Sequence, residues 1–342
     1  MSKHTVPMRF ITLIFVWIAS VVWVSCSDSN SKAPDSTGRS SEILVVCSNA
    51  NWSGAVGDSI RAALTSTIQG LPEAEPEFTL IHIVQKDFSR VLQSHRNILM
   101  ADVDAGNKKS KVETLTNVWS HPQRVVKVKA GSDTAFLNLF VSHGAAILEL
   151  FKQNERARFS AMNALSGNPE IAKRLDDDYG ISMIISRDFY LAKKTKDFVW
   201  LRSEATTMSL GLMIYTFPYK DTAQLNPVSV VATRDRYARL YVPGPLAGSY
   251  MTTEKDNYTP ISQKILFKEM YAIETRGLWK TEGDFMGGPF INYSIVDAPR
   301  HRIIVFDGYV YNPNKPKRDY IRQLESIIWG AQFSDPAVTK SK

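Results

Sequence analysis

The stretch Arg276-Gly-Leu-Trp-Lys-Thr-Glu-Gly-Asp-Phe-Met-Gly-Gly-Pro-Phe290 contains four glycines, an arginine, a tryptophan and two acids. A phosphate-binding loop needs a helix directly after its glycines, so that backbone amides and the helix N-terminus face the ligand. Here Pro289 follows the glycine pair and begins an apolar, strand-like run. We therefore predict a hairpin loop over residues 280–288, with Pro289 as the first residue of the following strand.

The segments around this hairpin predict an antiparallel sheet. Apolar runs bounded by turn residues indicate strands at 181–186, 197–204, 210–217, 265–279, 289–297 and 301–311. One helix is expected from Asn226-Pro227 to about residue 241, and a second ends at Gly330. Strands followed by a helix suggest helices on one face of the sheet, and the βββα order near 181–241 and 265–330 suggests a structural repeat.

The preceding residues alternate strands with helices. Strands are expected at 42–47, 78–84, 98–103 and 124–129, with a helix near 57–69 after the first strand. A long helix should begin after Ser132, its buried stripe formed by Phe136, Phe140, His143, Ile147, Leu150 and Phe151. We predict an α+β protein: an α/β part with long helices over 42–180, a mostly antiparallel sheet with packed helices over 181–334, and a tail over 335–342.

The N-terminus has the pattern of an export signal. Lys3 and Arg9 precede an apolar run of fifteen residues over 10–24, and no acid accompanies them. A membrane-spanning helix needs about 20 apolar residues, whereas the apolar region of a secretory signal needs about 7–15. An uncleaved anchor is the alternative. Residues 1–25 are therefore interpreted as a signal peptide, and the small polar residues of 26–41 as a flexible tether.

Val24-Ser25-Cys26 resembles the lipobox of bacterial lipoproteins, in which a cysteine is acylated. The sequence departs from that pattern at Trp23, where an aliphatic residue is usual. The resemblance implies acylation, as by palmitate, at Cys26 and stable anchoring in a lipid bilayer, since two or more acyl chains anchor a protein. Ser27 after the cysteine implies the outer membrane, on either its periplasmic face or the cell surface.

Composition excludes several classes of function. Removal of Lys3 and Arg9 with the signal lowers the net charge from +7 by two, to +5, and the remaining basic residues are scattered. Nucleic-acid binding is not expected from such a chain. No zinc-binding or nucleotide-binding spacing occurs, so no metal or cofactor is predicted. Cys47 would remain the one cysteine of the soluble body and is expected to be a buried, unpaired strand residue.

The residues that most resemble a site are Arg276, Trp279, Glu282 and Asp284. Paired carboxylates can hydrolyse glycosides when they face each other across a cleft, usually from separate elements. Two acids within one turn are more often solvated. We therefore assign no catalytic residue and keep these four as a candidate ligand or loop site.

A set of short segments spread in order over residues 41–330 resembles the family called domain of unknown function 4837. These segments include Ser41-Glu-Ile-Leu-Val-Val46, Trp119-Ser-His-Pro-Gln123, Phe198-Val-Trp-Leu-Arg202, Val242-Pro-Gly-Pro245, Gly248-Ser-Tyr-Met-Thr-Thr-Glu254, Arg276-Gly-Leu-Trp279 and Phe285-Met-Gly-Gly-Pro-Phe290. The resemblance implies a bacterial envelope lipoprotein without an assigned activity, and it supplies no catalytic residues. At the level of fold, the second part also resembles the Mog1/PsbP-type sandwich.

Two hypotheses for function follow. The first is a non-catalytic envelope lipoprotein that binds an envelope protein or a glycan and serves assembly or maintenance. The second is an envelope hydrolase that acts on glycan or peptide through an unrecognised acid site. The tether, the aromatic body and the lack of a catalytic pattern favour the first.

Overall fold

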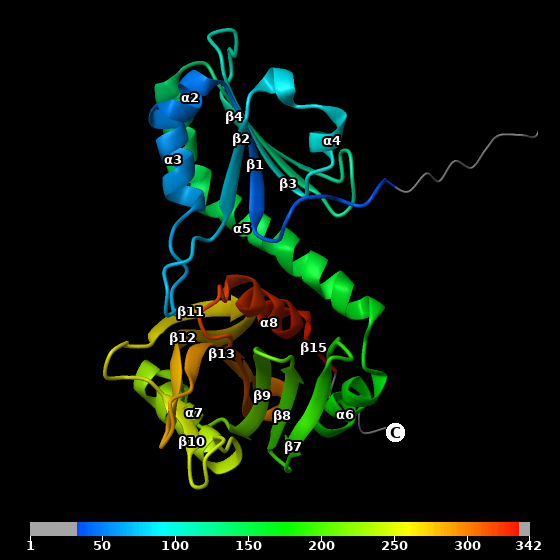
Figure 1. The fold of residues 1–342 in the computed structure, drawn as a ribbon, viewed down its shortest axis with the longest axis vertical. Coiled ribbons are helices and arrows are strands. Elements are labelled where there is room, and N and C mark those ends of the chain that lie inside the picture. The colour runs from blue at the N-terminus through cyan, green and yellow to red at the C-terminus, as the bar shows by residue number, and fades with distance from the viewer. Residues whose placement is uncertain (1–32, 335–342) are drawn as a thin grey trace, which may run out of the picture.

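The computed structural model describes residues 33–334, which form two units stacked end to end. Helix α5 (Asp133–Leu165) starts in the N-terminal unit and runs down to the C-terminal unit (Figure 1). The predicted signal peptide, Cys26, most of the predicted tether and the tail at 335–342 lie outside the described residues. The α+β fold class predicted from the sequence is confirmed.

The N-terminal unit is a five-stranded sheet in the order β2-β1-β3-β5-β4. Its strands are β1 (Glu42–Val46), β2 (Thr79–Ile83), β3 (Asn97–Val103), β4 (Lys111–Thr116) and β5 (Arg124–Ala130). All pairs are parallel except β4 with β5. Its shorter helical elements are α2 (Asn49–Ser53), α3 (Ala55–Leu64), η1 (Gln85–Asp87) and α4 (Arg90–Gln93).

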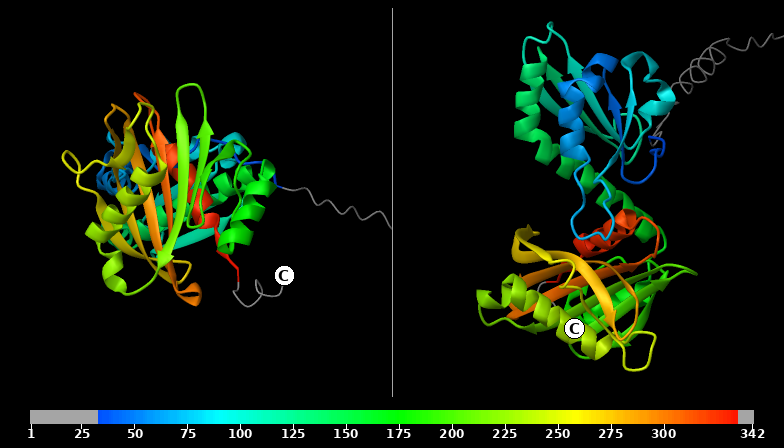
Figure 2. Two further views of the ribbon diagram at one scale, coloured as in Figure 1. Left: turned by 90° about the horizontal axis from the view of Figure 1, so that it is seen from below. Right: turned by 60° about the vertical axis from the view of Figure 1, so that its left-hand side comes forward.

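Helices α3 and α5 cover one face of this sheet (Figure 2). The predicted stripe of α5 is buried at Phe136, Phe140, Ile147 and Phe151. His143, expected among these core residues, is instead exposed and contacts the carbonyl oxygen of Leu139 through Nδ1 at 2.9 Å. The length and apolar composition of α5 would suffice for a membrane span, and its apolar stripe packs on the sheet in this structure.

The C-terminal unit is an eight-stranded antiparallel sheet in the order β10-β12-β13-β14-β9-β8-β7, with β11 also paired to β12. Its strands are β7 (Phe189–Lys194), β8 (Phe198–Glu204), β9 (Ser209–Pro218), β10 (Tyr250–Thr253), β11 (Ile261–Phe267), β12 (Met270–Glu282), β13 (Gly287–Asp297) and β14 (Arg302–Tyr311). Short helical turns η2 (Thr222–Leu225) and η3 (Ala298–Arg300) connect them, and β6 (Ile181–Ser182) pairs separately with β15 (Gln332–Phe333).

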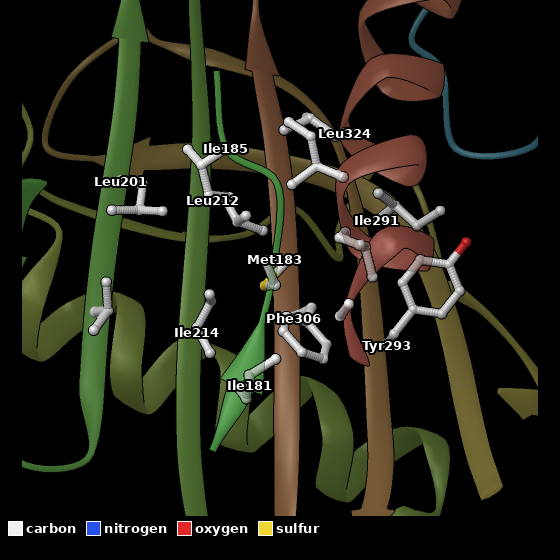
Figure 3. Packing of buried hydrophobic residues seen from close by; sticks show 14 of the residues in the cluster. Ile181, Met183, Ile185, Leu201, Leu212, Ile214, Ile291, Tyr293, Phe306 and Leu324 are labelled. Carbon is white, nitrogen blue, oxygen red and sulfur yellow. The ribbon is translucent and has the colours of Figure 1, made fainter. Parts of the chain in front are cut away.

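Helices lie on both faces of this sheet, not on one as the sequence suggested. Helices α6 (Pro169–Tyr179) and α8 (Arg318–Gly330) share one core with Leu212, Ile214 and Phe306 (Figure 3). Helix α7 (Pro227–Tyr241) packs into a separate core on the opposite face. The βββα order therefore recurs, but its two helices cover opposite faces. Helix α6, assigned from sequence to the N-terminal part, belongs to the C-terminal core.

The two units meet where α8 contacts Ser41 and Glu77 of the N-terminal unit. Arg322 of α8 donates to Ser41 Oγ at 2.9 Å and pairs with Glu77 at 2.8 Å, and the Ser41 amide donates to Glu155 of α5 at 3.1 Å. The described end of the predicted tether is docked, since the amides of Ser36 and Thr37 bond to the N-terminal unit. The expectation of a flexible tether up to residue 41 is wrong for this end.

Candidate functional site

The stretch from Arg276 to Phe290 forms the predicted hairpin, with a shorter turn than expected. Strand β12 runs on to Glu282 and β13 begins at Gly287, so that Trp279 pairs with Gly288. Gly283 adopts φ +82°, a left-handed conformation that favours glycine. Pro289 is the third residue of β13, which corrects its predicted place as the first.

Gly288 is needed because of a close approach between strands and not because of a positive φ. A Cβ atom at Gly288 would lie 2.1 Å from the carbonyl oxygen of Val310. The indole of Trp279 reaches across this glycine and donates from Nε1 to the same oxygen at 3.1 Å. Because Gly288 has no side chain, the Trp279 ring packs against the sheet, where it is almost fully buried.

The Trp279 ring forms part of an apolar groove of about 400 Å³ on the α7 face of the sheet. Three aromatic residues from separate strands line it, together with Met251 and Met286: Trp200, Trp279 and Tyr309. Trp200 Nε1 donates to the Tyr309 hydroxyl at 2.9 Å, and the Trp279 and Tyr309 ring centroids are 5.4 Å apart. Burial raises the pKa of Tyr309 far above its usual value, so this phenol stays neutral.

Two exposed apolar side chains sit in the loops that flank this groove. Phe285, in the hairpin turn, is fully exposed at 106%, and Leu246 is 56% exposed in the loop after Pro245, which lines the groove. The two loops lie against each other, because a Cβ atom at Gly283 would be 3.5 Å from Ser249 Cβ. We call the groove with Phe285 and Leu246 the aromatic groove.

The two predicted acids lie at the end of β12 and in the following turn, beside the aromatic groove. Glu282 is exposed at the end of β12, opposite Tyr250 of β10. Asp284 accepts a hydrogen bond from the Phe285 amide at 2.7 Å, which fixes the turn. In residues 33–334 neither carboxylate forms an ion pair. The lack of ion pairs agrees with the interpretation of these two acids as solvated residues near a turn.

Arg276 faces the other side of the sheet, as its spacing from Trp279 predicted. It lines a cleft of about 360 Å³ between the two units. Its Nε is 2.7 Å from Glu274 Oε1 on the same strand, and its guanidinium also pairs with Glu325 of α8. The partner that the sequence left open is thus a pair of acids, and the four candidate residues do not form one site.

The charges in this cleft neutralise one another. Burial alone would raise the pKa of Glu325, but the charges of Arg276, Lys152 and Arg156 overcome it and lower that pKa to about 2. Both Glu325 and Arg276 therefore stay charged at neutral pH. The arrangement is an ion-pair network within the C-terminal unit, at its surface toward the N-terminal unit, and it lacks a free acid for proton transfer.

Sequence reasoning missed most of the aromatic groove. Trp200, Tyr309 and Met251 were not singled out as site residues, and all three are buried in the structure. Trp200 and Arg202 alternate onto the same face of β8, with the Arg202 guanidinium carbon 4.9 Å from the Trp200 ring centroid. That alternation could have indicated an aromatic ring covered by a charged side chain, but the other groove residues come from β12 and β14 and are not predicted by the pattern of β8.

Cys47 and the histidines offer no nucleophilic or metal centre. Cys47 lies one residue beyond the end of β1 and not within the strand as predicted, whereas its burial and its free thiol among the described residues agree with the prediction. Burial raises the pKa of Cys47 to about 11, against a smaller opposing effect of Arg61, so its reactive thiolate is scarce. Across residues 33–334 no group of three or more His, Cys, Asp or Glu side chains is placed to hold a metal ion.

Comparisons with known proteins give two family matches. Residues 168–330 match the family described as domain of unknown function (DUF4837), and residues 36–163 match domain of unknown function (DUF8532). No curated protein matches the chain.

Solved structures show distant likenesses. A mutant of the protein Mog1 is 8% identical with a TM-score of 0.32, covering 47% of this chain and 94% of that one. The Saccharomyces cerevisiae Ran-binding protein Mog1p is also 8% identical with a TM-score of 0.32, covering 46% and 93%. A Bacteroides thetaiotaomicron protein is 9% identical with a TM-score of 0.25, covering 47% of each. Likenesses with TM-scores this low carry no conclusion about function.

Proposed function

Residues 168–330 belong to the family of domain of unknown function 4837, and from this premise we propose that the protein is a lipid-anchored bacterial envelope protein that binds a partner and catalyses no reaction. Cys26 would carry the acyl chains and hold the body at the outer membrane. The aromatic groove would hold an apolar side chain of an envelope protein, in the service of assembly or maintenance.

The observation that carries this proposal is the aromatic groove itself. Its volume of about 400 Å³ falls within the range of about 300–1,000 Å³ usual for binding sites. Trp and Tyr are also the residues most enriched where binding energy concentrates in protein interfaces. The exposed side chains of Phe285 and Leu246 extend the apolar surface beyond the part lined by Trp200, Trp279 and Tyr309.

An apolar protein side chain suits this groove better than a glycan. A sugar presents hydroxyl groups that need donors and acceptors, yet the indole N–H groups of Trp200 and Trp279 already bond within the protein. The ring faces that remain are apolar. The hydrolase alternative lacks a supporting observation, since Glu282 is exposed at the end of β12, Asp284 bonds within its turn, and Glu274 and Glu325 are held by Arg276.

Photo-crosslinking in living cells tests the proposal. A benzophenone side chain replaces Phe285, and as a matched control it replaces Val91, which is 76% exposed on the N-terminal unit. We expect a discrete protein adduct from position 285 alone, and its loss when Leu246→Asp is added. Equal adducts from both positions, or an adduct that Leu246→Asp leaves unchanged, would overturn groove binding.

The same cells separate binding from hydrolysis. Glu282→Gln and Asp284→Asn should keep both the adduct and the cellular role of the protein, because these acids stabilise only a turn. Loss of the cellular role with the adduct intact would instead support the hydrolase hypothesis.

A further inference from the structure

The N-terminal unit contains a second cavity, which the proposed function does not use. In the order β2-β1-β3-β5, the chain leaves β1 toward β2 on one side and then crosses to β3 on the other. The carboxyl ends of β1 and β3 thus flank the point where the direction of winding reverses. Open α/β sheets bind their ligands in the crevice at this point.

A cavity of about 450 Å³ lies at this place. The ends of β1, β3 and β5, the start of α2 and the first residue of η1 line it. The polar side chains that face it come from Ser48, Asn51, Gln85, Asp102, Lys127 and Lys129. Its position and size agree with those of small-molecule sites, which commonly measure about 300–1,000 Å³.

The lysines of this cavity are half-buried and unpaired. Lys127 and Lys129 alternate onto the same face of β5. Within the part of the chain described, neither ammonium has a carboxylate oxygen within 4.0 Å, whereas nearby Lys111 pairs with Glu113 at 2.5 Å. Asp102 is the one acid of the lining and lies opposite Lys129 in the strand register. The cavity therefore carries an excess of one positive charge.

The remaining polar groups are free to orient a ligand. The side-chain amides of Asn51 and Gln85 form no hydrogen bond within residues 33–334. Met100 and Val46 add apolar surface from the strands below. An anion with a small apolar portion would meet charge at one end of the cavity and apolar surface at the other.

We propose that this cavity binds a small organic anion through a phosphate or carboxylate group, held by the ammonium groups of Lys127 and Lys129. Asn51 and Gln85 orient the ligand through hydrogen bonds. The carboxylate of Asp102 repels a highly charged anion and so limits the negative charge that the ligand can carry. Binding is non-covalent, since the site needs no nucleophile. This site is separate from the aromatic groove, and neither proposal depends on the other.

Thermal unfolding and calorimetry on the full chain test the proposal with inorganic phosphate, pyrophosphate and acetate as probes, against chloride at matched ionic strength. We expect at least one oxyanion to raise Tm. Stabilisation by the phosphates alone identifies a phosphate group, and stabilisation by acetate alone identifies a carboxylate. Lys127→Met and Lys129→Met should each weaken the Kd about tenfold, as expected for loss of a charged hydrogen bond.

Two further variants make the test specific. Lys108→Met with Lys109→Met removes two exposed lysines of the neighbouring turn and should change the Kd by less than about twofold, as distant surface charges do. Asp102→Asn should tighten binding, because it removes the opposing charge. The absence of any oxyanion effect, or equal weakening in the control variant, would overturn the proposal.

Discussion

A buried ion pair beneath the aromatic groove gives the sharpest test of how the C-terminal unit is held together. Arg234 of α7 is 1% exposed and Asp307 of β14 is 0% exposed. Arg234 Nε donates to Asp307 Oδ2 at 2.9 Å, and Nη1 donates to Thr253 Oγ1 at 3.0 Å. Asn292 donates to the same carboxylate oxygen at 2.8 Å, while Asp307 Oδ1 has no partner among the described atoms.

Arg234→Met removes the charge but keeps an unbranched stem against Phe290, whose ring centroid is 3.9 Å from the guanidinium carbon. The variant leaves the Asp307 carboxylate with one hydrogen bond in a dry core. Removal of one partner from such a buried pair lowers the free energy of unfolding by about 3–5 kcal/mol. Arg234→Met with Asp307→Leu removes both charges and should recover part of this loss, leaving about 1–3 kcal/mol for the buried Asn292 amide that loses its acceptor.

The deficit of Arg234→Met should also depend on pH. Burial raises the pKa of Asp307 despite the opposing charge of Arg234, so loss of Arg234 raises it further. Above the unfolded pKa of about 3.9, the folded state then binds more protons than the unfolded chain, and stability falls as pH rises. The difference in free energy of unfolding between Arg234→Met and the natural protein should therefore decrease on acidification from pH 7 toward the pKa of an unfolded carboxyl group.

Urea unfolding followed by tryptophan emission, at neutral and mildly acidic pH, measures these effects. A loss below about 1 kcal/mol in Arg234→Met would show that the pair is not the energetic link between α7 and the sheet. A double variant as unstable as the sum of its single variants would refute the argument that the unpaired charge is the cause.

The remaining predictions concern other parts of the chain. Gly288→Ala should lower the free energy of unfolding by about 1–3 kcal/mol through its clash with Val310, whereas Gly330→Ala, with open space around it, should change it by less than about 1 kcal/mol, both measured by urea unfolding. The folded pKa of Glu325, about 2, lies below its unfolded value, so its stabilising effect of about 3 kcal/mol is complete above the unfolded pKa and disappears as pH falls toward 2. Glu325→Gln should therefore flatten the acid side of the stability profile, and an unchanged profile would contradict the assignment. Cys47 should react with iodoacetamide at pH 8 far more slowly in the native than in the urea-unfolded protein, and equal rates would show that it is accessible. Cys26→Ala, at a position outside the described residues, should move the processed protein from the detergent phase to the aqueous phase, and retention in detergent would show a second anchor.

The sequence predicts elements well where burial determines composition. The apolar run of β1 and the capping residues Asn226 and Ser132 lie where predicted, because buried parallel strands and helix N-termini restrict which residues fit. Strand β4 was not predicted, since it is an exposed edge strand rich in charge. Strands β11 and β12 were merged into one, because Lys268 and Glu269 make their turn at positive φ without a glycine.

The candidate site could be predicted only in part, because periodicity gives the face of a residue and not its neighbours. The spacing of Arg276 and Trp279 correctly placed them on opposite faces of β12. Glu325 becomes a partner of Arg276 only because α8 packs across the sheet, and no local sequence pattern predicts that packing.

Because side chains alternate along β12, the two faces of this strand carry different types of residue. Its even-numbered residues Glu274 and Arg276 face α8 and the N-terminal unit, where charges pair and are satisfied. Its odd-numbered residues Trp279 and Thr281 face the aromatic groove, where the Trp279 N–H bonds within the protein and the exposed apolar surface is that of Phe285 and Leu246 in the flanking loops. A paired charge network gains little from a ligand, since its desolvation is already balanced within the protein. Exposed apolar surface such as that of Phe285 and Leu246 gains free energy when a partner removes it from water. The groove is therefore the side of β12 on which binding should be sought, and the cleft at Arg276 is the side on which β12 is paired to α8 and faces the N-terminal unit.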